Sequence, residues 1–390
     1  MLSDLTLAYA EEVTSALLGA DALLRTPGGD EDAGLFVLNM GPHLPATLFS
    51  GLDAAEACFR ELQAAAARLP ELDRQIYYRQ LCGSTLAILG HRRHALSLAE
   101  QIERFLHVAA APASDAQLDG MRQEIRSRLT AMGYDGDLAA QCAAWERNLL
   151  VEPGEVAAVI ADLLDQAWDR TAARIEFPAP KADGMRVATV RGAHFNARSD
   201  YLARTIEINI DPALTRPALK HLAVHEGYPG HYLQFKLRQH WYQQGLAPAD
   251  GLLSLVNSAS SCTFEGIADC GLRWLDWIDS DDDRLSALLS RYRAGLGTAA
   301  AWRLHALGWD ATRTADWLRE RALIGGEGWV ANRMGFIAAP QRCALITSYW
   351  QGEPSVAAAW GRMPGGRSSD AFVRFVYGRM HSPESILLFN

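Results

Sequence analysis

The chain reads His225-Glu226-Gly227-Tyr228-Pro229-Gly230-His231 directly after an apolar, helix-favouring run at residues 218–224. Neutral imidazole is the commonest side-chain ligand of metal ions in proteins. A glutamate beside such a ligand can act as general base towards a water molecule that the metal activates. Two imidazoles and a carboxylate within seven residues, on a helical background, therefore indicate a zinc site.

The spacing of the two histidines differs from that of an ordinary helical zinc motif. Each residue of an ideal helix turns by about 100°, so histidines six apart differ by about 120° and do not easily share one metal. Pro229 has no N–H to donate to the carbonyl of His225, and Gly230 tolerates unusual dihedral angles. The pair predicts a kink or bulge that returns His231 to the place of an i+4 histidine, as in HExxH. Alternatively, the pair ends one helix and the histidines are surface or capping residues.

A third protein ligand is expected, because catalytic zinc usually takes three and leaves one position for water. Glu265 stands in an apolar helical stretch whose inner face is expected to meet the helix of His225. A carboxylate there is costly unless a cation or a donor satisfies it. Asp269, four residues later, falls on the same face and is a candidate acceptor for the outer N–H of a ligating histidine. The alternative is a pair of acids facing water, which would repel slightly at this spacing.

The string HEGYPGH, with Gln234 three residues later and Phe-Glu-Gly-Ile-Ala at 264–268, resembles the bacterial domain-of-unknown-function 885 (DUF885) family. Members carry an HExxPGHxxQ motif and a later glutamate in an EGxA context. The family is grouped with the zincin-like metallopeptidases, and its fold is predominantly helical. The resemblance is convincing over roughly residues 201–268 and weaker to about residue 352.

The resemblance implies that His225, His231 and Glu265 are the zinc ligands and that Glu226 is the catalytic base. Asp269 matches the aspartate that follows the glutamate ligand by four residues in related zinc peptidases. Gln234 belongs to the family motif, without a defined role.

Two features depart from the family pattern. Family members are commonly longer, so the resemblance implies a trimmed N-terminal half here. Many also have a Pro-Gly-Gln segment shortly before a Tyr-x-x-Gly element near the C-terminus. This chain has Tyr349 and Gly352 at the Tyr-x-x-Gly spacing, but residues 340–348 fit the preceding segment poorly. Tyr349 is a candidate donor to the developing oxyanion, and the alternative is a buried core tyrosine.

Two further polar residues lie near the motif. Residues 205–210 alternate in character and predict a strand before the motif helix, where an edge strand of zinc peptidases often pairs with an extended substrate. Asn209 in this strand is a candidate substrate contact, and the alternative is ordinary turn chemistry. His221 lies on the same side of the helix as His225, either supporting the site or as a satisfied surface histidine.

The rest of the chain predicts a mainly α protein: a large helical zincin-like metallopeptidase fold with a small β-element before the motif helix. Apolar residues at three- and four-residue spacing predict helices at about 3–25, 52–68, 71–108, 115–132, 137–150 and 153–175. Strands are expected at 185–190 and 205–210, and helices resume at Pro212 with Asp211 as N-cap. Helix breaks are expected at 245–248, 279–283, 308, 325–326 and 364–366. A seam at 175–183 suggests an N-terminal helical region (1–175) and a catalytic region (176–390), packed as one unit.

Composition excludes several classes of protein. The formal net charge of −9 over 390 residues argues against a nucleic-acid partner. No apolar run of about 18 residues predicts a membrane span. The N-terminus has no basic region typical of a secretory signal. The six scattered cysteines favour a reduced, cytoplasmic setting. Oligomeric state is not indicated.

These residues together predict a zinc-dependent hydrolase, a metallopeptidase acting on small peptides. Glu226 takes the proton as zinc-bound water attacks the carbonyl carbon, and passes it to the leaving amine. Two alternatives stay open. One is a catalytically inactive helical protein that binds a metal or another ligand. The other is a metal-dependent hydrolase of a non-peptide, small-molecule amide, which would share the ligands and differ in its pocket.

Overall fold

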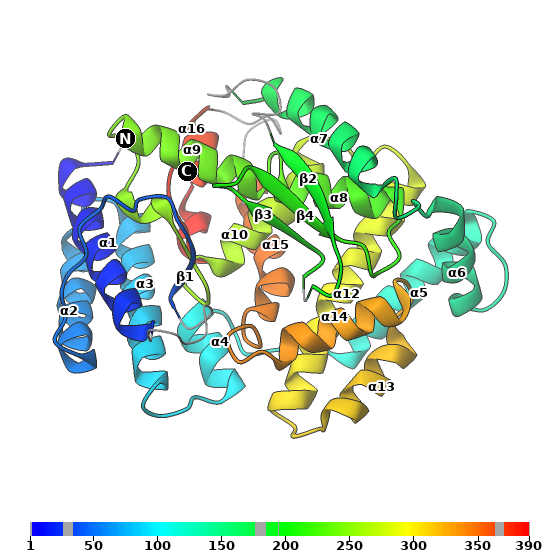
Figure 1. The fold of residues 1–390 in the computed structure, drawn as a ribbon, viewed down its shortest axis with the longest axis horizontal. Coiled ribbons are helices and arrows are strands. Elements are labelled where there is room, and N and C mark those ends of the chain that lie inside the picture. Colours follow the sequence, from blue (N-terminus) through cyan, green and yellow to red (C-terminus); the bar gives the residue numbers. More distant parts are fainter. Residues whose placement is uncertain (1, 26–33, 176–184, 194, 363–369, 390) are drawn as a thin grey trace. The chain divides into compact units, whose positions relative to one another are not determined.

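The computed structural model describes residues 2–25, 34–175, 185–193, 195–362 and 370–389. Helices dominate these residues and the sheets are small, so the predicted mainly α fold is confirmed (Figure 1). The chain forms two compact units, each assembled from separate stretches. The first unit comprises residues 1–110, 234–267 and 351–390, and the second comprises 111–233 and 268–350.

The first unit is built on a set of neighbouring N-terminal helices. Its elements are α1 (Asp4–Leu24), α2 (Leu52–Ala65), α3 (Leu72–His91), α4 (Leu98–Leu106), α16 (Asp370–Tyr377) and the antiparallel strand pair β1 (Phe36–Asn39) and β5 (Leu253–Leu255). Buried apolar side chains of α1, α2 and α3 form one core with residues of β5. The helix expected at 71–108 is two helices, because Ser97 forms a capping box with Glu100 and starts α4 afresh.

The second unit carries a three-stranded sheet beside long helices. Its elements are α5 (Asp115–Ala131), α6 (Leu138–Leu149), α7 (Val156–Ala172), β2 (Arg186–Val190), β3 (Ala197–Asp200), β4 (Thr205–Asn209), α8 (Arg216–Glu226), α11 (Gly271–Trp274), α12 (Asp281–His305), α13 (Ala311–Arg321) and α14 (Gly326–Ala338). Within this unit, α7 packs against α8 and β2, and α8 also packs against β3 (Figure 1). Three helices run across the boundary between the units: α9 (His231–Gln243), α10 (Ser261–Asp269) and α15 (Ile346–Gly361).

The two strands expected from the sequence are present as β2 and β4. However, β4 is the central strand, since it pairs in parallel with β2 and antiparallel with β3. The expectation of an edge strand at 205–210 is therefore wrong. The sequence did not reveal β3, because its residues are polar and lack the β-branched pattern of a strand. A cross-strand ion pair, Arg198 to Glu207 at 2.6 Å, joins β3 to β4 instead.

The start of the motif helix also differs from the expectation. Helix α8 begins at Arg216, with the Thr215 hydroxyl accepting a hydrogen bond from the Ala218 N–H at 3.3 Å. Asp211 is not the N-cap. Its carboxylate instead accepts from the N–H of Gly192 at 2.5 Å and from Arg191 at 3.2 Å, and so closes the loop after β2.

Two expectations fall on residues outside the described part of the chain. These are most of the seam at 175–183 and the helix break at 364–366. The expected division near residue 175 differs from the two compact units, because both expected regions contribute to both units. The helix breaks expected near residues 245, 308 and 325 are present.

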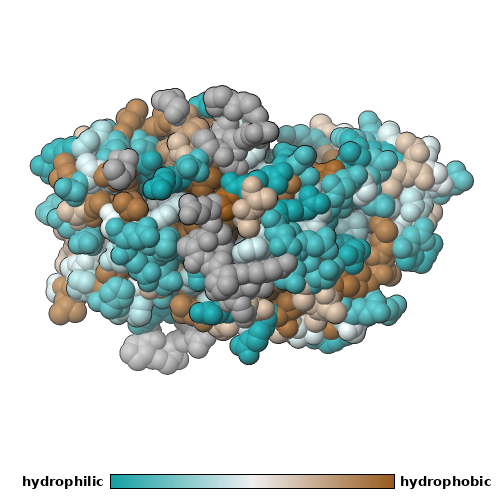
Figure 2. Space-filling model, turned by 90° about the horizontal axis from the view of Figure 1, so that it is seen from above, coloured by the Kyte–Doolittle hydropathy of each residue, from teal (hydrophilic) through white to brown (hydrophobic). Residues whose placement is uncertain are grey.

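Hydrophilic residues cover much of the face in Figure 2, with hydrophobic residues in small groups among them. None of the described helices is both long enough and apolar enough to cross a bilayer.

A buried ion pair ties α8 to α12. The Lys220 ammonium lies 2.8 Å from the Asp283 carboxylate, and both side chains are at most 10% exposed. Lys220 also lies 4.6 Å from the centre of the Trp277 ring. The first turn of α12 thus combines an exposed Asp281 with this buried Asp283.

We expect Asp283→Ala to lower the free energy of unfolding by about 3–5 kcal/mol, because Lys220 would lose its buried counter-charge and keep only the exposed Asp279 carboxylate at 3.5 Å. The matched control is Asp281→Ala, since Asp281 lies in the same helical turn but is 72% exposed and should cost less than about 1 kcal/mol. Urea unfolding followed by circular dichroism measures both. Equal effects of the two substitutions would contradict the assigned role of the buried pair.

Candidate metal and catalytic site

The motif forms a helix break that closes again over six residues. Helix α8 ends at Glu226 and α9 begins at His231. The last regular bond joins the Gly227 N–H to the Ala223 carbonyl at 3.0 Å. Next, the Gly230 N–H donates to the Val224 carbonyl at 3.0 Å, and the Leu233 N–H donates to the Gly227 carbonyl at 3.3 Å. Each of these two bonds spans six residues instead of four, so the two additional residues are absorbed between the helices.

This closure brings the two histidines together. The ring centres of His225 and His231 lie 4.6 Å apart, with the ring planes inclined at 83°. Both side chains are buried, at 7% exposure each. The proline-glycine pair therefore does end a helix, as the alternative held, but the histidines are neither surface nor capping residues. Six-residue spacing here achieves the proximity that four-residue spacing gives in a continuous helix.

Glycine is required at the closing turn. A Cβ at Gly230 would overlap the carbonyl oxygens of Val224 and His225, and a Cβ at Gly227 would overlap Leu164 and the Ala223 carbonyl. The backbone thus passes too close to the end of α8 for any side chain. The peptide bond between Tyr228 and Pro229 is cis.

Asp269, on α10, orients the first histidine. Its Oδ1 lies 2.9 Å from His225 Nδ1 and 3.5 Å from His221 Nε2. A carboxylate accepts only, so His225 Nδ1 carries the proton and Nε2 is left as the ligand atom. His221 is thus a partly buried neighbour of the site, with a side chain that is 22% exposed. Burial, opposed by Asp269, lowers its pKa to about 4.

The two glutamates occupy different helices. Glu226 closes α8 and is 5% exposed, with Oε1 4.0 Å from His225 Nε2. Glu265 lies on α10, one helical turn before Asp269, and is 8% exposed. Among the described residues, His225, His231 and Glu265 form one group able to hold a metal ion, and His221, His225 and Asp269 form another.

Gln234, on α9, has a clear structural partner. Its Nε2 donates to the Phe264 carbonyl at 3.0 Å, and its Oε1 accepts from Arg238 at 3.0 Å. Both Gln234 and Arg238 are buried. Arg238 thereby fixes which way the amide points, and Gln234 fixes α9 to the residue that precedes Glu265.

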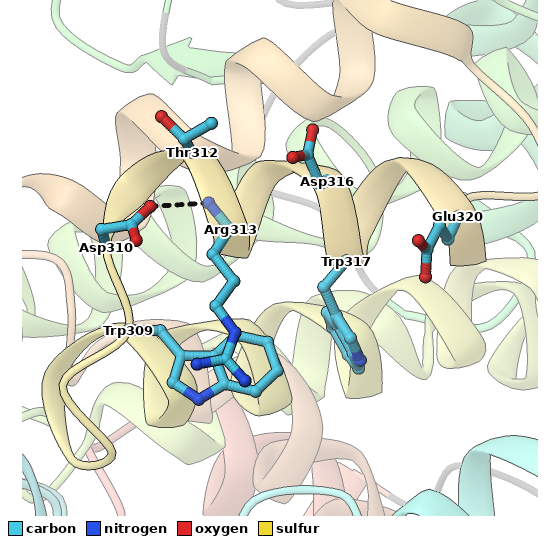
Figure 3. Close-up of a pocket in the computed structure, with 7 residues that line it drawn as sticks. All are labelled: Trp309, Asp310, Thr312, Arg313, Asp316, Trp317 and Glu320. Atoms are coloured by element: carbon cyan, nitrogen blue, oxygen red, sulfur yellow. Dashed lines mark hydrogen bonds between the residues drawn. The ribbon is translucent and has the colours of Figure 1, made fainter.

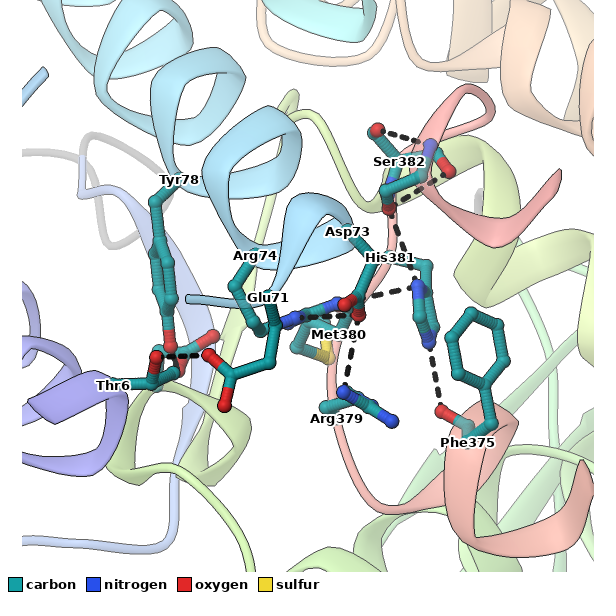
Figure 4. Close-up of polar contacts among 12 residues, drawn as sticks. Thr6, Glu71, Asp73, Arg74, Tyr78, Phe375, Arg379, Met380, His381 and Ser382 are labelled. Atoms are coloured by element: carbon teal, nitrogen blue, oxygen red, sulfur yellow. Dashed lines mark hydrogen bonds and ion pairs between the residues drawn. The ribbon is translucent and has the colours of Figure 1, made fainter. Parts of the chain in front are cut away.

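A buried network of polar side chains, which the sequence did not suggest, holds the start of α10 (Figure 4). Arg74 donates to the Met380 carbonyl at 2.8 Å and lies 3.2 Å from His381 Nδ1, while His381 Nε2 donates to the Phe375 carbonyl at 2.7 Å. The Thr263 hydroxyl, on α10, donates to the His381 carbonyl. Burial, reinforced by Arg74, holds the pKa of His381 well below its usual value. Its lone position in the sequence gave no sign of this role.

Asn209 is engaged within its own loop. Its side-chain amide donates to the Ala193 carbonyl at 3.0 Å and accepts from the Asp211 N–H at 3.1 Å, and the residue is 1% exposed. These contacts favour the turn interpretation over a substrate contact. Asn332, on α14, donates to the same Ala193 carbonyl at 3.1 Å, so this turn also anchors α14.

Tyr349 lies in the fourth position of α15 and is half-buried. Its ring centre lies 6.2 Å from that of Phe336 in an edge-to-face arrangement. Its hydroxyl exerts an electrostatic effect on Arg333 of α14, where it opposes the burial that lowers the arginine's pKa. A role in oxyanion stabilisation stays a prediction.

A separate pocket lies on α13 and contains none of the predicted site residues (Figure 3). Trp309, Trp317 and three acidic residues line it. The Arg313 guanidinium lies 3.8 Å from the centre of the Trp309 ring and stacks over it. Trp309 and Trp317 thus line this pocket, whereas Trp329 of the same unit is fully buried.

Comparisons with known proteins show the fold alone. No family model matches the sequence, and no curated protein matches it. Two solved structures are described as putative lipoproteins. The one from Colwellia psychrerythraea has a TM-score of 0.55 and 15% identity over 88% of this chain. The other, of unknown function, from Shewanella oneidensis, has a TM-score of 0.52 and 13% identity over 86% of it.

This chain is shorter than both neighbours. The match covers 63% of the Colwellia protein, which is less than two thirds, and 70% of the Shewanella protein. At these identities, the likeness supports a shared helical architecture and carries no information about activity.

We expect Gly230→Ala to lower the free energy of unfolding by about 2–4 kcal/mol, because its methyl group would displace the carbonyls that close the helix break. The control is Gly120→Ala in α5, where a Cβ meets nothing within 4 Å. That change should stabilise by about 0.5–1 kcal/mol. Chemical denaturation of both variants checks the pair, and a harmless Gly230→Ala would contradict the described closure.

Proposed function

We propose that this protein is a zinc-dependent hydrolase, most specifically a metallopeptidase that cleaves a peptide bond in small peptides. The observation that carries the proposal is the six-residue closure, which sets the rings of His225 and His231 4.6 Å apart. If the helix simply ended at the proline, the backbone bonds that bridge the break and the close contact of two buried imidazoles would not be expected. The resemblance of the motif to the DUF885 family supports the same assignment.

The donor set fits zinc. Two imidazoles and one carboxylate, from His225, His231 and Glu265, are a usual ligand set of catalytic zinc and leave a position for substrate or water. Asp269 supports the set by holding the Nδ1 proton of His225. Zinc bound there would polarise a substrate carbonyl and lower the pKa of water.

Other residues of the chain would supply proton transfer and oxyanion stabilisation. Glu226 would accept the proton of the attacking water and deliver it to the leaving amine. Its burial at the end of α8 would keep the carboxylate out of bulk water and beside His225. Tyr349 is proposed as a donor to the developing oxyanion. Asn209 is left out of the substrate site, since its amide is committed to the turn after β4.

Two other functions differ in what they predict. A catalytically inactive metal- or ligand-binding protein would keep the ligands without hydrolysis. A hydrolase of non-peptide amides would keep the ligands and the chemistry but reject peptides. The buried Glu226 beside His225 favours a hydrolase over a binding protein, because a carboxylate that is not needed as a base would be costly there.

We expect the purified protein to hold about one zinc ion per chain. A hundredfold excess of free zinc over the dissociation constant should stabilise the metal-free protein by about 2.7 kcal/mol. His231→Ala and Glu265→Gln should abolish both effects, whereas His240→Ala, a control on α9 outside the ligand set, should not. Metal analysis and thermal unfolding measure them. Full zinc content in His231→Ala would overturn the ligand assignment.

We expect Glu226→Gln to retain zinc and thermal stability while hydrolysis of a panel of short peptides falls by about 10²- to 10⁴-fold, as for loss of a general base. The matched control is Glu207→Gln, which makes the same change on β4 in an ion pair with Arg198. Undiminished hydrolysis by Glu226→Gln would overturn the mechanism. Zinc binding without hydrolysis of any peptide by the unmodified protein would favour one of the other two functions.

A further inference from the structure

Two arginines of the second unit lie against one buried tryptophan. The guanidinium carbon of Arg293, on α12, is 4.8 Å from the centre of the Trp329 ring, and that of Arg333, on α14, is 5.6 Å from it. Trp329 is fully buried and Arg333 is 9% exposed, while Arg293 is partly exposed. Solvent therefore reaches one member of the pair.

Among the described residues, the partly exposed Arg293 and the buried Arg333 differ from the buried Arg74 and Arg238 in having no hydrogen-bond acceptor. Arg74 pairs with Asp73 at 2.9 Å, and Arg238 donates to Gln234 at 3.0 Å. By contrast, no acceptor in the described part of the chain takes a hydrogen bond from Arg293 or Arg333. Arg333 Nε and Trp329 Nε1 are both buried donors without a partner there. Buried donors are normally satisfied, so such a group needs an explanation.

The charges around the indole ring do not balance. Glu146 is the acid whose charge acts on Arg293, and its Oε1 also accepts the Gly325 N–H at 2.7 Å. Burial raises the pKa of Glu146. Burial, together with repulsion from Arg333, lowers the pKa of Arg293 to about 9, and burial lowers that of Arg333 to about 10. Among the described residues, Glu146 is thus the carboxylate that acts on Arg293, and only the Tyr349 hydroxyl acts on Arg333 to favour its charge, so one carboxylate accompanies two guanidinium groups.

We propose that Arg293, Arg333 and the indole N–H of Trp329 form a binding site for the carboxylate group of a small organic anion. The planar forks of two arginines match the two oxygens of a carboxylate. A single negative charge completes the balance with Glu146, whereas a phosphate dianion would reverse it. None of these residues belongs to the proposed zinc ligand set, although Tyr349, the proposed oxyanion donor, acts electrostatically on Arg333.

Calorimetric titration of the full-length protein tests the site. The probes are acetate, succinate and N-acetyl-L-alanine, with N-acetyl-L-alanine amide as the neutral counterpart and inorganic phosphate as the competing anion. The variant is Arg333→Gln. The matched control is Arg313→Gln. Arg313 also stacks on a tryptophan of the same unit, but the second arginine at that ring, Arg303, is paired with the Asp115 carboxylate at 2.9 Å.

We expect at least one of the carboxylates to bind, the amide not to bind, and Arg333→Gln to weaken binding by about 10- to 100-fold, the loss of charge-assisted hydrogen bonds. Arg313→Gln should bind as the unmodified protein does. Absence of binding by all three carboxylates would overturn the proposal. Equal binding by Arg333→Gln, as for a carboxylate held by a metal elsewhere, would also overturn it, as would a clear preference for phosphate.

Thermal unfolding without ligand separates this role from a structural one. An arginine kept for ligand binding is an unpaired buried charge in the free protein, so Arg333→Gln should leave Tm unchanged or raise it. A marked fall in Tm would mean that Arg333 supports the fold, and would overturn the proposal even if binding were lost.

Discussion

The hydrogen bond from the Gly230 N–H to the Val224 carbonyl is the constraint on which the candidate site depends. Proline at position 229 removes one backbone donor, and a continuous helix through this point is therefore impossible without a gap. The chain instead passes close enough to the end of α8 for the next N–H to reach a carbonyl six residues back. That approach leaves no room for a Cβ, so position 230 is glycine. The proximity of the two imidazoles follows from this backbone geometry.

Helix α10 is fixed by partners on both sides of Glu265. Upstream, Gln234 holds the Phe264 carbonyl and Thr263 donates to the His381 carbonyl. Downstream, Asp269 accepts from His225. A carboxylate that is to bind a metal must be held in one rotamer and one place, and fixing the backbone just before it restricts its freedom at low cost. The position of Gln234 in the motif thus acquires a physical reason: it positions the helix of the third proposed ligand.

The sequence predicted the features that local chemistry determines. Periodic apolar residues gave the helices, and the proline-glycine pair gave the break at residues 229–230, because each depends on neighbours in the chain. It did not predict that β4 is central, since β3 is polar and is joined to β4 through pairing across strands. Nor did it predict the capping of α8. Asp211 and Thr215 are both good caps, and the loop after β2 engages the first.

Long-range partners explain the remaining differences, and they are most evident for buried charges. Lys220 meets Asp283 from 63 positions away, and His381 meets Arg74 across 307, so neither pair leaves a trace in local sequence. The same comparison of buried charges with their long-range partners applies to Arg293 and Arg333. Where the fold buries a charge for its own stability, it supplies a partner, as it does for Lys220 and Arg74. Arg333 is buried and Arg293 is partly buried, and neither has a hydrogen-bond acceptor among the described residues. An uncompensated buried charge is costly unless something binds it. Their lack of an acceptor among the described residues is therefore better explained by a ligand than by packing.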